Sequence, residues 1–100
     1  MTVKTYLSFD VGTKRTGIAI ANSLTVNASG IETILHNKDG STNWAQIEQS
    51  VSKHQPHKFI VGLPLDNDNK EQEMTFIARS FGRKLEQRFN IEVIFIDEYL

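Results

Sequence analysis

Alternation of apolar and polar residues along several short segments predicts most of the strands in this chain. Residues 4–10 alternate in this way, and residues 17–21 (GIAIA) form a second apolar run after a short turn. The two segments therefore predict a hairpin. A third extended segment is expected between Thr25 and Leu35, where Gly30 indicates a bulge or a bend.

Two later segments repeat apolar residues at the three- and four-residue steps of an α-helix. The first begins after a turn-rich segment, where Asn43 and Gln46 have the spacing of a capping box, and it ends before Pro56. The second spans residues 74–85 and has the clearest helical period. The apolar runs KFIVGL and IEVIFID, between and after the helices, predict two more strands.

The resulting order, β-β-β-α-β-α-β, predicts an α/β fold with a mixed five-stranded sheet flanked by helices. Hairpin strands should be antiparallel, and the two helical crossovers should be right-handed and make the later strands parallel to the first. A chain of 100 residues has room for one domain, so residues 1–100 are read as a single unit. A closing helix over the remaining sheet face would be expected, so we expect a C-terminal truncation.

Composition narrows the classes of function. The net charge is −1, so any contact with nucleic acid must come from a local basic patch. The absence of cysteine excludes disulfides and thiolate metal sites. The first ten residues do not resemble a signal peptide, and no apolar run approaches the ~20 residues of a membrane helix. We therefore expect a cytoplasmic protein that has no membrane partner.

Three acidic residues stand where strands of the predicted sheet end. Asp10 closes the first strand, and Asp97 and Glu98 close the last. If these strands are parallel, the acids lie at one carboxyl edge, where α/β sheets bind ligands. Neighbouring residues in a strand face opposite ways, so we favour Glu98, with its longer reach, over Asp97. Such oxygen ligands indicate Mg²⁺ or Mn²⁺, whereas a lone strand-end Asp can also be a turn cap.

Candidate phosphate ligands surround these acids. The loop after Asp10 has flexible glycine at Gly12 and positive charge at Lys14 and Arg15, which would hold phosphates beside a metal. Thr13 belongs to the same loop. The alternative is a hairpin whose basic side chains are merely solvated.

Two further segments have open interpretations. Gly62 and Pro64 end the fourth predicted strand, either as part of the site or as a simple strand exit. Arg79 and Arg83 are one helical turn apart and either follow a phosphate backbone or form a solvated face.

Three motifs together resemble one known family. They are D-x-G-x-K-R-x-G-x-A from Asp10 to Ala19, V-G-L-P-L from Val61 to Leu65, and D-E at residues 97–98. In this order and spacing they resemble the YqgF (RuvX) family, described as candidate pre-16S rRNA nucleases and Holliday junction resolvases. The resemblance implies an RNase H-like fold and a carboxylate site for Mg²⁺ or Mn²⁺, in which Asp10 and Glu98 match the family's first- and fifth-strand acids.

The chain also departs from the family pattern. Tyr99 replaces the arginine of the D-E-R motif, and Asp66-Asn67-Asp68-Asn69 replaces the usual Asp-Gly. The family's third acid, in a later helix, has no match before Leu100. The resemblance implies two-metal hydrolysis of structured RNA, in 5′-end processing of the 16S rRNA precursor, or of branched DNA. Because one acid is missing, we expect the 100-residue chain to be weakly active or inactive.

Two other classes of function stay open at this point. Asp10-Val11-Gly12-Thr13 also resembles the phosphate loop of sugar-kinase and actin-like ATP-binding lobes, but those proteins are several times longer. A non-catalytic RNA-binding factor in ribosome assembly could use the same basic residues. Neither the choice between RNA and DNA nor that between monomer and homodimer follows from the sequence.

Overall fold

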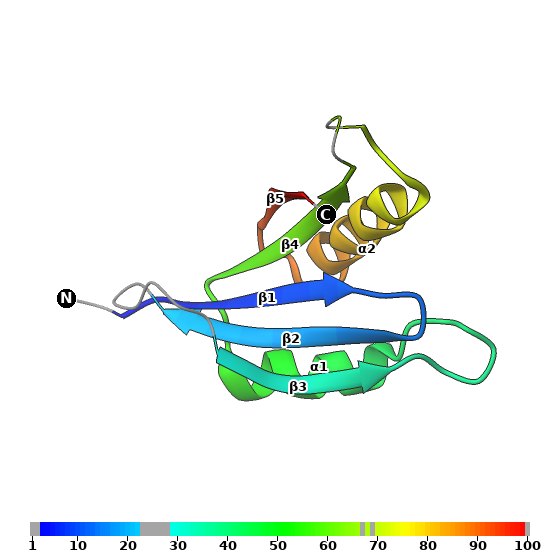
Figure 1. Cartoon of the computed structure of the whole chain (residues 1–100). Coiled ribbons are helices and arrows are strands. Elements are labelled where there is room, and N and C mark those ends of the chain that lie inside the picture. Colours follow the sequence, from blue (N-terminus) through cyan, green and yellow to red (C-terminus); the bar gives the residue numbers. More distant parts are fainter. Residues whose placement is uncertain (1–2, 23–28, 67, 69, 100) are drawn as a thin grey trace.

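The structure, a computed structural model, describes residues 3–22, 29–66, 68 and 70–99. Its elements follow the predicted order (Figure 1). The strands are β1 (Thr5–Val11), β2 (Arg15–Asn22), β3 (Ser29–Leu35), β4 (Lys58–Leu65) and β5 (Val93–Tyr99). The helices are α1 (Trp44–His54) and α2 (Glu73–Phe89).

The five strands form one mixed sheet in the order β3-β2-β1-β4-β5. Strand β2 pairs antiparallel with both β1 and β3, whereas β4 pairs parallel with both β1 and β5. The predicted strand directions are therefore confirmed. Because β1, β4 and β5 are parallel neighbours, their carboxyl ends lie at the same edge of the sheet.

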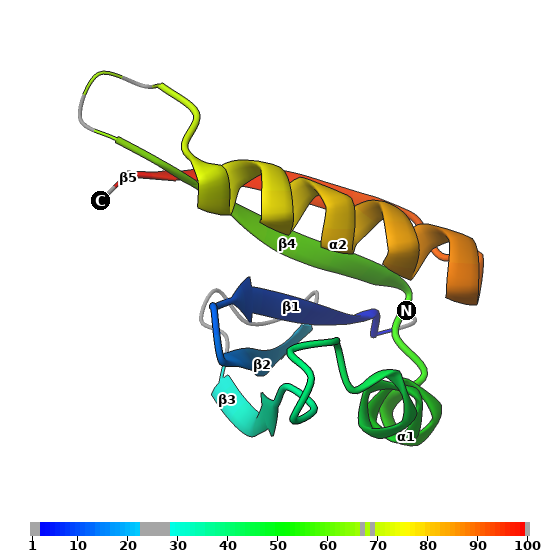
Figure 2. The same cartoon turned by 90° about the vertical axis from the view of Figure 1, so that its right-hand side faces the viewer.

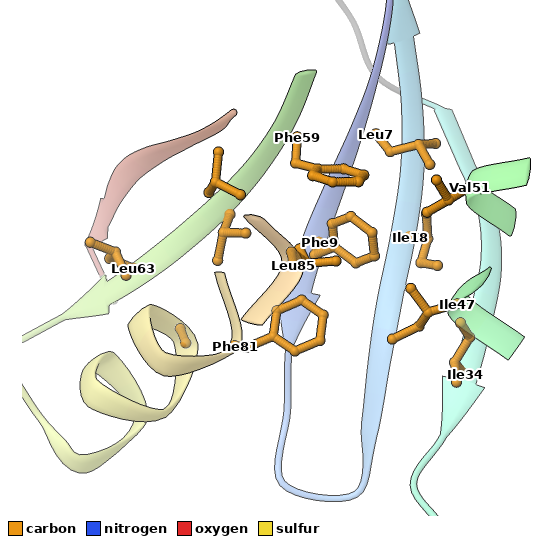
Figure 3. Close-up of a cluster of buried hydrophobic side chains, with 13 residues drawn as sticks. Leu7, Phe9, Ile18, Ile34, Ile47, Val51, Phe59, Leu63, Phe81 and Leu85 are labelled. Carbon is orange, nitrogen blue, oxygen red and sulfur yellow. The ribbon is translucent and has the colours of Figure 1, made fainter. Parts of the chain in front are cut away.

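Both helices pack on one face of the sheet, as Figure 2 shows from the side. The aromatic ring of Phe9 on β1 lies 5.7 Å from that of Phe59 on β4 and 5.4 Å from that of Phe81 on α2, measured between centroids. Figure 3 shows how these rings join the aliphatic side chains of α1 and β2 in a single core. Residues at the alternate strand positions face away from this core.

Side-chain caps fix where the helices begin. The Asn43 side chain accepts a hydrogen bond of 3.2 Å from the Gln46 backbone N–H, which confirms the predicted start of α1. Gln72 and Thr75 form a capping box at α2. The Thr75 hydroxyl also donates to the Pro64 carbonyl, and this bond ties the start of α2 to β4. Within the described residues, neither helix is long and apolar enough to cross a membrane.

Strand ends differ from the prediction in two places. Strand β2 begins at Arg15, inside the expected loop, and β4 continues through Pro64 to Leu65. The β4 pairing with β1 extends only to Val61, so beyond it β4 has β5 as its partner and can accommodate a proline. The predicted bulge is confirmed, since the β2–β3 register shifts beside Gly30; residues 25–28 of that segment lie outside the described residues.

Candidate metal and phosphate site

Asp10 lies at the carboxyl end of the central strand β1, opposite Gly17 of β2. Its neighbour Phe9 is buried under the helices, so the alternation of the strand turns Asp10 to the opposite face. The side chain is exposed there. The first predicted ligand thus stands on the sheet face that the two helices leave open.

Glu98 lies on the same face, two strands away. Strand β4 separates it from Asp10, and Glu98 pairs with Pro64 of that strand. A Cβ atom built on Gly62 would stand 2.5 Å from the Glu98 Cδ and 2.6 Å from each of its carboxylate oxygens. The carboxylate of Glu98 therefore lies directly over Gly62, above the strand that separates it from β1.

The two carboxylates interact electrostatically. Partial burial raises the pKa of Glu98, and the charge of Asp10 raises it further. Both causes penalise the ionised form of Glu98. A cation between the two groups would offset this penalty, which makes the pair a physically suitable place for a divalent ion.

A hollow of about 300 Å³ opens between these acids on the open face. Mg²⁺ is commonly held by one or two carboxylates together with water and substrate phosphate, so Asp10 and Glu98 suffice for one such ion. Glu32 also lines the hollow, but its carboxylate accepts a 3.0 Å hydrogen bond from Gln46 of α1. Within the described residues, no group of three His, Cys, Asp or Glu side chains has a metal-binding arrangement.

Asp97 is separated from this hollow by the alternation of β5. It pairs with Leu63, a residue of the core, so it belongs to the face that carries the helices, where it is exposed. Of the two neighbouring acids, the structure brings Glu98 and not Asp97 to Asp10.

The basic residues Lys14 and Arg15 are exposed at the same edge, just beyond Asp10. The Gly12 N–H donates to the Arg15 carbonyl (2.9 Å), and the His36 N–H donates to the Lys14 carbonyl (2.9 Å). These bonds fix the backbone of the turn against the segment that precedes α1. Neither basic side chain forms an ion pair with any residue that the structure describes, so both charges are available to a substrate.

The other predicted phosphate ligands have different surroundings. Arg79 forms an ion pair with Glu71, and the guanidinium of Arg83 lies 5.9 Å from the ring centroid of Phe95. Phe95 shares the helix-covered face of β5, so these two arginines are not brought to the hollow. Pro64 pairs with Glu98, and Thr13 lines a second cavity on the helix side.

Two features of the site were missed by sequence reasoning. The sequence pattern predicts Gly62 at a strand end, as part of the site or as a simple strand exit, whereas Gly62 lies within β4 and leaves the space that Glu98 occupies. A glycine within an otherwise apolar strand is a signal for such close approach. The second cavity joins residues far apart in sequence, and the sequence carried no signal for it.

Comparison with known proteins identifies relatives over the length of the chain. A family model described as "RuvX: Holliday junction resolvase" matches residues 4–100. A protein of Aeromonas salmonicida (strain A449) named "Putative pre-16S rRNA nuclease" is 44% identical over 100 residues, which cover the whole chain and 71% of that protein. A protein of the same name from Saccharophagus degradans is 43% identical and is covered over 70% of its length.

Solved structures show a likeness of fold alone. Pelota of Archaeoglobus fulgidus superposes with a TM-score of 0.60 over 97% of this chain and 28% of its own, at 10% sequence identity. The shared feature is therefore the arrangement of sheet and helices.

Proposed function

The chain belongs to the RuvX family, whose RNase H-like fold it shares, and from this premise we propose that it is a nuclease that hydrolyses phosphodiester bonds with Mg²⁺ or Mn²⁺. One observation carries the proposal. Asp10 and Glu98 come from strands that are not neighbours, yet they share one hollow because Gly62 leaves room for the Glu98 carboxylate. Such a pair of acids at the carboxyl edge of a sheet suits a hydrated divalent ion.

Each residue has a role that follows from its position. Asp10 and Glu98 would hold the ion, which when bound supplies an activated water and neutralises charge on the phosphate. Lys14 and Arg15 lie beyond the end of β1, where they can hold flanking phosphates and fix the register of the strand to be cut. Gly62 positions the Glu98 carboxylate.

The substrate we propose is the precursor of 16S rRNA, processed at its 5′ end. The names of relatives that are 43–44% identical support this choice. The family description names Holliday junctions, so branched DNA is the second candidate. Both nucleic acids present the same phosphodiester group to the acids.

The first test is metal binding to the 100-residue chain. Mn²⁺ should broaden backbone NMR signals at the ends of β1 and β5, and the Asp10→Asn variant should lose this effect. Asp97→Asn is the matched control, because this neighbouring carboxylate lies on the opposite face. Equal broadening in all three proteins, or none in any, would overturn the metal site.

The second test is cleavage of a 16S precursor fragment and of a four-way DNA junction in Mg²⁺ and in EDTA. Because the chain lacks the family's third acid, we expect only weak Mg²⁺-dependent cleavage of the RNA. This cleavage should be lost in Asp10→Asn and Glu98→Gln and kept in Asp97→Asn. Cleavage of the junction alone would select the second candidate. Cleavage that survives Asp10→Asn would refute the proposed role of the acids.

A further inference from the structure

A cavity of about 520 Å³ lies beyond the end of β1, on the side of the sheet that carries the helices. One wall is the β1–β2 turn together with the segment between β3 and α1, which lie side by side at one end of the sheet (Figure 1). The other wall is α2. The helix contributes one continuous stripe: Glu73, Phe76, Ile77, Ser80, Phe81 and Lys84.

The loop wall is preorganised by hydrogen bonds. The Asn37 N–H donates to the Ser41 carbonyl (2.9 Å), and the Gly40 N–H donates to the Asn37 carbonyl (2.8 Å). The Asp39 carboxylate accepts bonds from the Ser41 hydroxyl and N–H, which lower the pKa of Asp39. Because the loop closes on itself, the cavity does not need to form when a ligand arrives.

The helix wall combines an apolar surface with a single cation. Phe76 is 57% exposed and Ile77 is 42% exposed, although both are large apolar side chains. Lys84 is exposed on the same stripe and forms no ion pair in the part of the chain that the structure describes. In contrast, the neighbouring stripe carries Arg79, which pairs with Glu71, and Arg83, which makes a cation–π contact with Phe95.

We infer that this cavity binds an unstacked nucleotide of single-stranded nucleic acid, next to the phosphate that is cut at Asp10. The inference rests on the proposed nuclease function. An exposed aromatic ring provides a stacking surface for a base, and Lys84 provides a charge for a phosphate. The hydroxyls of Thr13, Thr42 and Ser80 suit the sugar and the base edge. Glu73, the acid of the cavity, can accept from amino groups of a base.

The position of the cavity supports the same ligand. Val11 lines it and directly follows Asp10, so their Cα atoms are about 3.8 Å apart. The pleat of β1 turns these two residues to opposite faces of the sheet. One flexible strand can therefore pass around the end of β1 from the hollow to the cavity. A continuous duplex keeps its bases stacked and paired and cannot place one of them there.

The test measures binding apart from catalysis. A fluorescein-labelled single-stranded RNA of five nucleotides is titrated into the chain in EDTA, with fluorescence anisotropy as the readout. Phe76→Ala should weaken binding on the order of tenfold, and Phe76→Trp should restore it, because a ring is available again. Lys84→Ala should weaken binding and reduce the salt slope by about one, whereas the exposed Lys53→Ala on α1 serves as the matched control.

Each outcome has a distinct meaning. Equal affinity of wild type, Phe76→Ala and Lys84→Ala overturns the inference, as does tighter binding of a duplex of the same sequence. A single-stranded DNA of the same sequence tests for a contact with the 2′-hydroxyl. If cleavage is lost in Asp10→Asn but unchanged in Phe76→Ala and Lys84→Ala, the nuclease proposal holds and the cavity has no part in it. RNA binding that needs Phe76, together with cleavage that survives Asp10→Asn, would keep the cavity and refute the nuclease role of Asp10.

Discussion

Replacing Gly62 with alanine should displace the Glu98 carboxylate and leave the fold intact. The new Cβ would lie 2.5 Å from Glu98 Cδ and 2.6 Å from both oxygens, whereas an ordinary contact is about 3.5 Å. The carboxylate must therefore move by on the order of 1 Å. A misplacement of this size in a reacting site can cost about 100-fold in rate, so Mg²⁺-dependent cleavage should fall about 10- to 100-fold.

The Gly62→Ala change should affect the free energy of unfolding much less than it affects cleavage. Glu98 is exposed, and its flexible carboxylate can move at little cost. Alanine is also favoured over glycine in a strand by roughly 0.5–1 kcal/mol. Urea unfolding of Gly62→Ala should accordingly stay within about 1 kcal/mol of wild type. Gly30→Ala is the matched control, because Gly30 lines the same hollow and nothing lies within 4 Å of a Cβ atom built there.

A double-mutant cycle with Glu98→Asp isolates this contact. Aspartate is one methylene shorter and does not reach over Gly62, so it should itself weaken Mn²⁺ binding. The added Gly62→Ala change should then cost little, because the space it fills is already empty. Additive losses in the double variant, or Mn²⁺ affinity and cleavage unchanged in Gly62→Ala alone, would refute the view that Gly62 acts through Glu98.

Three further predictions concern stability. The pKa of Glu98 is raised in the folded state. The contribution of Glu98 to the free energy of unfolding is therefore complete below the ordinary pKa of 4.5 and is lost as the pH rises through the raised pKa. In EDTA, Glu98→Gln should therefore be the more stable protein at pH 7 and equal to wild type near pH 4. The gain should be at most a few tenths of a kcal/mol, because solvent screens this exposed group; a stability gap independent of pH would contradict this. Gly82→Ala should destabilise the fold by about 1 kcal/mol or more in urea, because the added Cβ would lie 2.5 Å from the Phe95 ring and the cost of overpacking exceeds the gain in helix propensity; unchanged stability would show that the ring moves freely. Asn43→Ala should cost about 1 kcal/mol and Asn43→Asp much less, if the cap on Gln46 stabilises α1; equal losses would exclude the cap.

The local pattern of apolar and polar residues was sufficient to predict much of the fold. Alternation placed Phe9 and Asp10 on opposite faces of β1, and the same rule separated Asp97 from Glu98. The cap at Asn43 was readable because it involves residues three apart. These features depend on near neighbours in the chain, which the sequence displays directly.

Features that depend on distant segments could not be predicted in the same way. The extent of β4 depends on β1 ending earlier, which lets Pro64 stay within the strand. The ion pair of Arg79 depends on where the loop carries Glu71. The space above Gly62 is visible only when β5 is placed beside β4. In each case the deciding partner belongs to another element.

The two cavities at the end of β1 bear on the choice of substrate. Asp10 opens to the hollow on one face and Val11 to the cavity on the other, so a bound strand must turn sharply around the end of β1. Phosphodiester chemistry alone does not favour RNA over a four-way junction. A requirement for an unpaired nucleotide favours RNA. A single-stranded extension of an RNA can make this turn, whereas the arms of a junction are base-paired. Dependence of cleavage on Phe76 would therefore be evidence about the substrate as well as about the cavity.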